Sequence, residues 1–393
     1  MIVEQLSLVD FRNYAAAEVT LDRGPNLFVG SNGQGKTNLA EAIAYLATLG
    51  SHRVSTDAPL VREGADAAII RTRLAHGERR VQLELQINRQ GSNKARVNGA
   101  PIRPAELPRY AQVVLFAPED LQIVRGDPSA RRRFVDQLLI QRAPRMSGVL
   151  ADYDRVLPAA QCPAQVSPGA RDPRRSAVHA RGVGRETRRP GVRGHRHPCR
   201  AQRRDVGAAR PCLRGDRRRR SRPGARVDAV GARRRPGRGR GCRDRRGRRR
   251  HPELFRAALA ARRSAELDRG VTLVGPHRDD LLLRVRGLPV KGYASHGESW
   301  SMALGLRLAS AELLRERSLL GDPVLILDDV FAELDADRRE RLAGMAAGYE
   351  QVIVTAAVEP DVPDALRAHV VRVEAGTILP ADAIPAAEPA DGR

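Results

Sequence analysis

The sequence predicts an α/β fold in which helices alternate with the strands of a buried parallel sheet. Two short runs, residues 323–327 and 351–355, have consecutive apolar residues at their centres, as strands buried on both sides do. A third expected strand, residues 21–30, ends in a glycine turn and leads directly into an amphipathic helix. Strands and helices alternate in this way near both ends of the chain, which is typical of an α/β architecture.

The elements expected in the N-terminal part follow from the spacing of apolar residues. Residues 2–10 alternate well enough for a strand, and the spacing of Leu39, Ile43, Leu46 and Leu49 predicts a helix that starts at Lys36. The other expected elements are a hairpin of strands 69–74 and 81–87, a buried strand at 113–116 and a helix at 129–142.

The C-terminal part predicts a second series of elements and shows no internal repeat. The expected elements are a helix at 253–267, a strand before Gly275, a helix at 297–316, a strand at 323–327, a helix from Asp335 and a strand at 351–355. Together the two parts are expected to build one sheet.

The bulk composition excludes a membrane protein and makes the net charge a poor guide to function. No run of eighteen apolar residues is present, and the first residues lack the basic-then-apolar order of a secretory signal, so a cytosolic protein is expected. The net charge of +23 would normally suggest nucleic acid. However, residues 161–250 hold 31 arginines and 6 acidic residues, which leaves 38 of the 69 basic and 40 of the 46 acidic residues for the rest. One block therefore carries the whole excess.

This block, residues 158–250, interrupts an otherwise ordinary chain. It holds all four cysteines at spacings that do not suggest a metal site. It is either a disordered basic linker or a segment translated out of frame from GC-rich DNA. Reading residues 158–165 one base later permits ordinary helical sequence that continues residues 152–157, which favours the second explanation. The expected divisions are 1–157, 158–250, 251–378 and a flexible tail at 379–393.

Residues 30–37 match the phosphate-loop pattern G-x-x-x-x-G-K-[ST] and lie between an expected strand and an expected helix, as that pattern requires. Backbone N–H groups of such a loop close around nucleotide phosphates, and the helix N-terminus adds its positive end. A chance glycine turn is the alternative, which this setting disfavours. The expected ATP-binding residues are Gly30, Ser31, Asn32, Gly33, Gln34, Gly35, Lys36 and Thr37, with Lys36 as a mobile charge and Thr37 as a Mg²⁺ ligand.

Two carboxylates follow the buried run 324–327. Asp328 is expected to hold Mg²⁺ through water, and Asp329 is expected to orient or deprotonate the attacking water. Two acids at this place could instead cap the next helix. Because the phosphate loop lies in the same chain, we favour the functional interpretation, with Asp329 and Lys36 as the catalytic candidates.

A third candidate motif opens the helix expected at 297–316. Ser295, Gly297 and Glu298 offer a hydroxyl, a backbone amide and a helix dipole end, which could close on the γ-phosphate of a nucleotide held by another subunit. An ordinary N-cap, with Ser295 or Ser299 as the capping residue, explains the same residues equally well.

These motifs occur in the order that is found in the ABC-type ATPases of the chromosome-maintenance group. The chain most closely resembles the RecF family of bacterial recombination proteins. The resemblance covers residues 1–157 and 251–375. It rests on the segments at 8–14, 30–41, 118–120, 126–128, 131–136, 275–280 and 328–335.

The resemblance implies ATP and Mg²⁺ as cofactors and an ATPase head with a helical second lobe. It implies that the segment from Ser295 to Glu298 completes the ATP site across an ATP-driven homodimer, with residues 332–335 as the dimer-contact loop. Thr355 lies where many ABC proteins place a switch histidine, so γ-phosphate sensing is not expected there. Glu119 lies near the glutamine-loop position without an assigned role, and His296 departs from the usual glycine.

The resemblance also implies a role in gap repair, in maintenance of DNA replication and in SOS induction. The family binds single-stranded and gapped double-stranded DNA, helps to load RecA with RecO and RecR, and has a weak DNA-stimulated ATPase. Arg131, Arg132 and Arg133 are candidate phosphate contacts, and an ion-paired helix face is the alternative. The block at 158–250 replaces part of the expected helical lobe, so the resemblance leaves the activity of this chain open.

Two other classes of protein remain as alternatives. A transporter ATPase shares the phosphate loop but lacks the segments at 11–14 and 131–136 and needs a membrane partner. A basic polypeptide that binds nucleic acid through its arginines would not be an enzyme at all. It would bind DNA independently of ATP and of Lys36.

Overall fold

The computed structural model describes residues 1–161, 226–229, 251–316, 318 and 321–379. They form two compact units, Met1–Asp120 with Ser310–Arg393 and Leu121–Ala309, and the boundary falls within helix α8 (His296–Arg315). In the described part of the chain, no helix is both long enough and apolar enough to cross a membrane.

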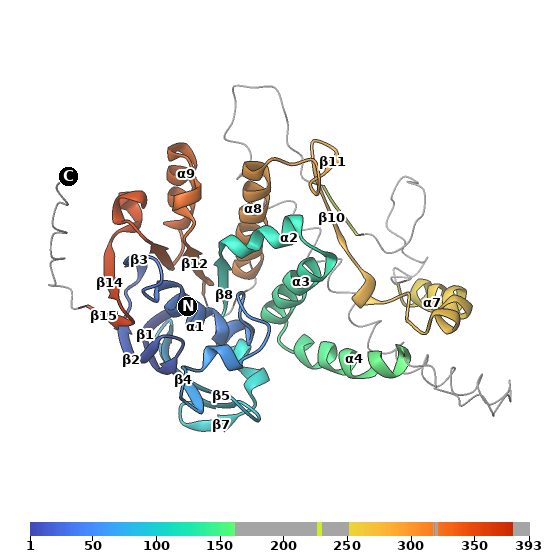
Figure 1. Ribbon diagram of the computed structural model, residues 1–393, viewed down its shortest axis with the longest axis horizontal. Coiled ribbons are helices and arrows are strands. Elements are labelled where there is room, and N and C mark those ends of the chain that lie inside the picture. The colour runs from blue at the N-terminus through green and yellow to red at the C-terminus, as the bar shows by residue number, and fades with distance from the viewer. Residues whose placement is uncertain (162–225, 230–250, 317, 319–320, 380–393) are drawn as a thin grey trace. The chain divides into compact units, whose positions relative to one another are not determined.

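The first unit contains a six-stranded sheet whose five main strands are parallel. Its order is β15-β14-β3-β13-β12-β8, and only β15 runs antiparallel to its neighbour. Most of these strands are labelled in Figure 1. The strands are β3 (Gly24–Val29), β8 (Val113–Phe116), β12 (Val324–Asp328), β13 (Gln351–Ala356), β14 (His369–Glu374) and β15 (Thr377–Ile378). Every residue of β12 and β13 is buried, as predicted for central strands of a parallel sheet.

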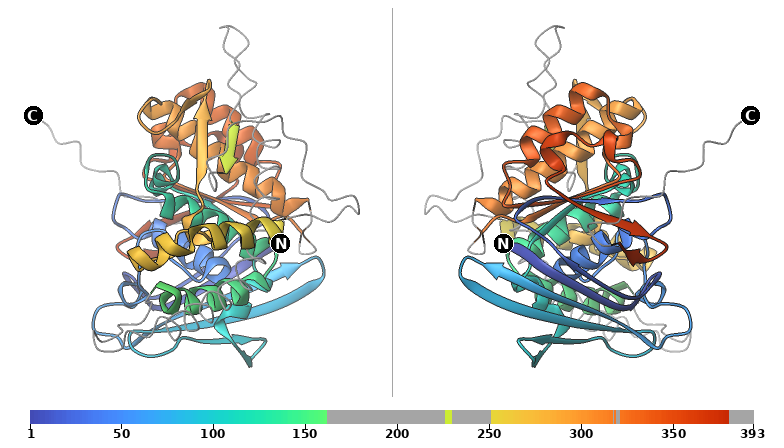
Figure 2. Two further views of the ribbon diagram at one scale, coloured as in Figure 1. Left: turned by 90° about the vertical axis from the view of Figure 1, so that its right-hand side faces the viewer. Right: turned by 90° about the vertical axis from the view of Figure 1, so that its left-hand side faces the viewer.

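A second six-stranded sheet of the same unit is antiparallel throughout, in the order β2-β1-β4-β5-β6-β7. Its strands are β1 (Ile2–Phe11), β2 (Tyr14–Thr20), β4 (Ala67–His76), β5 (Arg79–Asn88), β6 (Lys94–Val97) and β7 (Ala100–Ile102). The predicted hairpin is confirmed as β4 and β5, which run side by side in Figure 2. Along each of these strands every second residue points to the core. Ile70 of β4 and its cross-strand neighbour Leu85 of β5, for example, are fully buried.

Helix α1 (Lys36–Thr48) joins the two sheets into one hydrophobic core. Leu39, Ile43 and Leu46 are buried as their spacing predicted, in a cluster that also takes in residues of both sheets. The unit also contains α9 (Ala336–Ala346), whose N-cap Asp335 accepts a hydrogen bond from the Arg338 N–H. Short 3₁₀ helices complete it: η1 (Ala58–Leu60), η2 (Pro104–Arg109), η3 (Pro118–Asp120), η5 (Phe331–Glu333), η6 (Glu359–Asp361) and η7 (Asp364–Leu366).

The second unit is mainly helical. Its elements are α2 (Leu121–Arg125), α3 (Pro128–Arg142), α4 (Met146–Gln161), β9 (Arg226–Ala229), α7 (His251–Arg269), η4 (Pro276–Arg278), β10 (Leu281–Val285), β11 (Leu288–Pro289) and most of α8. The helices predicted at 129–142, 253–267 and 297–316 are confirmed as α3, α7 and α8.

The strand predicted before Gly275 is wrong, since residues 271–275 form a loop. Side chains take the hydrogen bonds that a neighbouring strand would make. The Leu273 N–H donates to the carboxylate of Glu266, and the Thr272 carbonyl accepts from Arg278. Apolar composition alone did not reveal this competition.

The segment that the sequence singles out, 158–250, lies largely outside the described residues. The described parts are the last turn of α4, which ends at Gln161, and strand β9, which pairs antiparallel with β10. Within the predicted tail at 379–393, only Leu379 is described, and its N–H donates to the Arg372 carbonyl. The predictions for these two segments stay predictions.

Candidate nucleotide site

The site is built at the carboxyl edge of the parallel sheet, where several strands end side by side. Asp328, the last residue of β12, is in register with Thr355 of β13, and Ala356 is in register with Val29 at the end of β3. The phosphate loop begins at the next residue, Gly30. Because ligands of open α/β sheets bind outside the carboxyl ends of the strands, this register brings distant motifs to one place.

The phosphate loop itself has the backbone geometry of an anion-binding turn. Gly35 has φ +119° and forms the N-cap of α1, a conformation that favours glycine. The ammonium of Lys36 donates to the carbonyls of Gly30 (2.6 Å) and Ser31 (2.9 Å), so the side chain lies along its own loop. Burial lowers the pKa of Lys36, although the nearby carboxylates Asp329 and Asp328 act to raise it.

The oxygen ligands expected for Mg²⁺ lie together beside Lys36. The hydroxyl of Thr37 donates to Asp328 Oδ1 at 2.9 Å, and the hydroxyl of Thr355 donates to the same oxygen at 2.6 Å. Burial raises the pKa of Asp328, and these two hydrogen bonds act in the opposite direction. Glu119 follows the neighbouring strand β8, and its Oε2 is buried without a hydrogen-bond partner. A hydroxyl and two carboxylates, one with a buried free oxygen, fit a hard cation that prefers oxygen ligands.

Asp329 occupies a special backbone position next to this carboxylate. It has φ +51°, a left-handed conformation that aspartate tolerates better than most residues, and its N–H donates to the Thr355 hydroxyl at 3.0 Å. It lies close enough to Lys36 to act on the pKa of that ammonium. Its catalytic role stays a prediction.

A clamp on the tip of the phosphate loop was not foreseen from the sequence. The Gln34 carbonyl accepts hydrogen bonds from the Asn13 side-chain amide and the Gly376 N–H, each at 3.0 Å, and its side chain accepts from the Ala375 N–H. The β1–β2 turn and the β14–β15 turn therefore hold the loop from two sides. No sequence pattern signals this, because the three segments are far apart in the chain.

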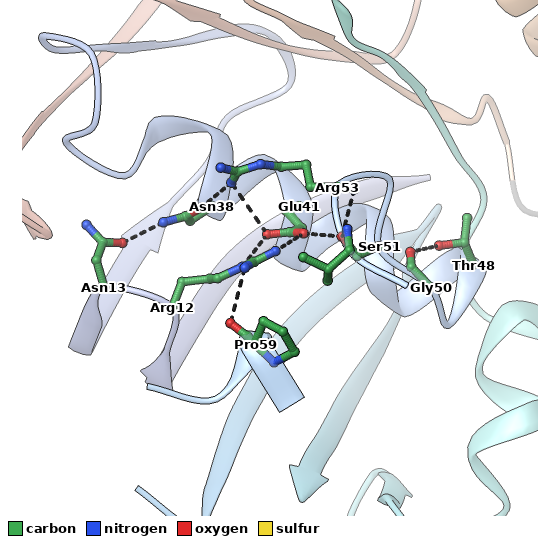
Figure 3. A network of polar contacts seen from close by, with 10 residues as sticks. Arg12, Asn13, Asn38, Glu41, Thr48, Gly50, Ser51, Arg53 and Pro59 are labelled. Carbon is green, nitrogen blue, oxygen red and sulfur yellow. Dashed lines mark hydrogen bonds and ion pairs between the residues drawn. The ribbon is translucent and has the colours of Figure 1, made fainter. Parts of the chain in front are cut away.

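Beneath the loop, a buried ion pair connects α1 to the β1–β2 turn (Figure 3). Arg12 donates to both carboxylate oxygens of Glu41, at 2.8 and 2.7 Å, and Glu41 is fully buried. Burial acts to raise the pKa of Glu41, but hydrogen bonds from Arg12 and Ser51 outweigh it, and the pKa is lowered. Arg12 also donates to the Pro59 carbonyl at 3.1 Å. The helix that carries Lys36 and Thr37 is thus fixed to the antiparallel sheet.

The predicted signature residues lie in the second unit, at the start of α8. The Glu298 N–H donates to the Ser295 hydroxyl at 3.2 Å, and the Ser295 N–H donates to the Glu298 carboxylate at 3.0 Å. This reciprocal pair is a capping box, so the N-cap interpretation describes the local structure. Gly297 lies between the two residues in the first turn. The role of these residues in a partner's ATP site stays a prediction.

The three arginines proposed as DNA contacts have different surroundings in α3. Arg131 is 6% exposed and donates to both carboxylate oxygens of Asp280, at 2.6 and 3.0 Å, so the ion-paired alternative describes it. Arg132 is partly buried and donates to the Asp279 carbonyl at 3.1 Å. Arg133 is exposed, and a phosphate contact stays a prediction for this residue.

The parallel sheet carries a phosphate loop and a strand-end carboxylate at one edge, and α1 joins it to an antiparallel sheet. This combination defines the class of ABC-type ATPase heads.

A family model described as "RecF/RecN/SMC N terminal domain" matches residues 2–378. The chain is 52% identical to the DNA replication and repair protein RecF of Clavibacter michiganensis subsp. michiganensis over 419 residues, 99% of this chain and 98% of the relative. It is 50% identical to the protein of the same name from Leifsonia xyli subsp. xyli, over 96% of this chain and 99% of the relative. The chain therefore belongs to the RecF family.

The fold agrees with this assignment. The solved structure described as "the recombination mediator protein RecF-ATPrS in RecFOR pathway" superposes with a TM-score of 0.80 at 22% identity, covering 96% of this chain and 97% of that one. The predicted fold class, an α/β ATPase head of the ABC and chromosome-maintenance type, is thus confirmed.

Proposed function

We propose that this chain is an ATP-dependent DNA-binding protein of recombinational repair and replication maintenance, which acts on single-stranded and gapped double-stranded DNA. It binds ATP with Mg²⁺ in the first unit and forms a dimer when ATP is bound. Its partners are RecR and RecO, with which it helps to load RecA in the bacterial cytoplasm and to induce the SOS response. The names of its relatives support the DNA repair part of this proposal.

The observation that carries the proposal is the set of hydrogen bonds around Asp328. Thr37 and Thr355 hold one oxygen of this buried carboxylate, and Lys36 and Asp329 lie beside it. Lys36 is free to exchange two loop carbonyls for phosphate oxygens, because its ammonium makes no ion pair within 4 Å in the described residues. Thr37 and Asp328 would hold Mg²⁺, which would supply positive charge beside the phosphates. Asp329 orients the attacking water.

The helix α8 start supplies the part of the site that a second subunit would complete. The Ser295 hydroxyl accepts from the Glu298 N–H and also interacts with the Glu298 carboxylate, and it would turn its proton to a phosphate oxygen when the partner's nucleotide arrives. The free end of the helix dipole favours an anion at the same position. ATP would therefore join two copies of the chain, with residues 332–335 at the contact.

The test is binding of a gapped duplex by the full-length protein, measured by fluorescence anisotropy with and without Mg²⁺-ATP over a series of salt concentrations. We expect DNA binding to depend on ATP. We also expect the logarithm of the association constant to fall linearly with the logarithm of the salt concentration. Lys36→Ala should abolish the ATP dependence, whereas Lys94→Ala, at an exposed position of β6, should leave it unchanged.

The same measurement separates the proposal from the alternatives. DNA binding that ignores both ATP and Lys36 and disappears when residues 161–250 are deleted would identify a basic polypeptide instead. ATP binding without any affinity for DNA would contradict the repair function and leave only a nucleotide-binding protein.

A further inference from the structure

A second buried polar atom of the first unit, a nitrogen, has no hydrogen-bond partner. His52 Nε2 is buried in the first unit without a hydrogen-bond partner, as is Glu119 Oε2. The carboxylate oxygen is explained by the expected metal. The imidazole nitrogen is not, because neither the phosphate loop nor the strand-end carboxylates use His52.

The position of His52 is fixed by both of its neighbours. Ser51 donates to the buried carboxylate of Glu41, and Arg53 donates to Asn38 Oδ1 at 2.8 Å (Figure 3). Asn38 and Glu41 are three residues apart and share one face of α1, the helix that starts with Lys36 and Thr37. The Ser51 hydroxyl also accepts hydrogen bonds from the N–H groups of Arg53 and Val54, which closes the turn. The turn that carries His52 is therefore held against the helix that carries the nucleotide site.

His52 also lies within electrostatic reach of the carboxylate at the end of β12. In its protonated form, its positive charge acts to lower the pKa of Asp328 and that of Glu41, although burial keeps the pKa of Asp328 raised. A buried ring nitrogen without a partner is unfavourable, since nearly all buried polar groups in native structures are hydrogen-bonded to protein, water or ligand. The ligand expected at the described site is the nucleotide.

A donor for the terminal phosphate is lacking at the position where the sheet would supply it. The hydroxyl proton of Thr355 is used by Asp328, and its oxygen accepts from the Asp329 N–H. Both neighbours of Thr355 at the strand ends are thus satisfied within the protein. A phosphate donor on this side must come from another segment.

We propose that His52 is a nucleotide-contacting residue, whose Nε2–H donates a hydrogen bond to a terminal phosphate oxygen of a bound nucleoside triphosphate, on the side of the site where Thr37 and Asp328 lie. This inference rests on the proposed ATP binding. It requires a proton on Nε2, which the imidazolium carries and which the neutral ring carries in one of its two tautomers. The contact exists with a triphosphate and is absent with a diphosphate.

The test compares ATP and ADP binding, both with Mg²⁺, to the full-length protein by isothermal titration calorimetry. His52→Phe keeps a ring of similar volume and removes the donor. We expect it to weaken ATP binding by about tenfold to a hundredfold, the range for a hydrogen bond to a charged group, and to leave ADP binding within about twofold.

Two further variants make the test independent of folding defects. The Gln amide nitrogen reaches the position of His Nε2, whereas the shorter Asn amide reaches only that of Nδ1. His52→Gln should restore most of the ATP affinity, and His52→Asn should not. The melting temperature without nucleotide should be the same for the Gln and Asn variants, so that their ratio of ATP affinities reports the contact alone.

Three outcomes would overturn the inference: equal loss of ATP and ADP affinity, unchanged ATP affinity in His52→Phe, or equal affinities for the Gln and Asn variants. Each requires that the wild-type protein binds ATP. If the wild-type protein binds neither nucleotide, the proposed function itself fails, and Lys36→Ala will then show no difference from wild type.

Discussion

Thr355 and Asp328 are joined by a 2.6 Å hydrogen bond between neighbouring parallel strands. The same Thr355 hydroxyl accepts from the Asp329 N–H, so one side chain holds the metal carboxylate and the backbone of the expected catalytic acid. The bond exists because β12 and β13 are in register at this residue pair. It makes Thr355 part of the nucleotide site although it contacts neither phosphate nor water in the proposed mechanism.

Thr355→Val should therefore weaken Mg²⁺-ATP binding by about tenfold, because a buried carboxylate loses one of its two hydroxyl donors. Thr355→Ser keeps the hydroxyl and should bind nearly as wild type. Calorimetric titration of both variants checks this. Equal affinities for the Val and Ser variants would show that the hydroxyl does not matter.

The Arg12–Glu41 pair predicts a large effect on stability. Glu41→Ala leaves the Arg12 guanidinium without its buried partner, and we expect the free energy of unfolding to fall by about 3–5 kcal/mol. Glu84→Ala is the matched control, since Glu84 pairs with the more exposed Arg71 and should cost no more than about 1 kcal/mol. Urea denaturation measures both. Similar losses in the two variants would contradict the special role of the buried pair.

Two glycines of the phosphate loop should differ in their tolerance of alanine. A Cβ on Gly35 would lie 2.6 Å from the buried Tyr14 hydroxyl, and the φ of +119° is unfavourable for any other residue. A Cβ on Gly33 meets open space, so only the left-handed backbone opposes it, at about 1–2 kcal/mol. We expect Gly35→Ala to lose ATP binding and Gly33→Ala to lose much less of it. The reverse order in nucleotide titrations would refute this geometry.

The carboxyl group of Asp279 predicts a dependence of stability on pH. Burial raises its pKa to about 7, and Asp136 acts in the same direction while Arg132 opposes it. Between the ordinary value of 3.8 and about 7, the folded chain keeps a proton that the unfolded chain releases, so this group makes stability fall as pH rises. Asp279→Asn, which cannot ionise, should raise the melting temperature at pH 8 by roughly 2–4 °C. At pH 4, Asp279→Asn should leave the melting temperature unchanged.

A melting curve that shows the same gain at both pH values would indicate better packing rather than loss of the charge. The control is Asp127→Asn, at an exposed acid in the same unit, which should not change the pH profile.

Arg131 and Arg133 should separate stability from DNA binding. Arg133→Ala is expected to weaken binding to all DNA sequences alike, because an exposed phosphate contact is lost. The slope of log affinity against log salt concentration should fall in magnitude by about one. Arg131→Ala breaks the pair with Asp280 and should destabilise the protein by about 3–5 kcal/mol. Anisotropy and denaturation on the same two variants test both statements. If Arg133→Ala binds DNA as tightly as the wild type, Arg133 does not contact DNA.

The fold was largely predictable because its strongest signals are local. The spacing of Leu39, Ile43 and Leu46 places one face of α1 in the core, and the two short apolar runs have the length of buried strands. The strand expected before Gly275 failed for a non-local reason. Its backbone groups are bonded to the side chains of Glu266 and Arg278, which an apolar pattern does not reveal.

The sequence by itself determined the phosphate loop, from Gly30 to Thr37, because its pattern, its glycines and its place between a strand and a helix are properties of one short segment. The partners of that loop were decided only by the tertiary structure. Asp328 lies 291 residues from Thr37, and the two meet because the ends of the parallel strands share one edge. Gln34 is held by Gly376 and by Asn13, which comes from the β1–β2 turn of the antiparallel sheet. Register and packing set those distances, and neither is written in the spacing of a single motif.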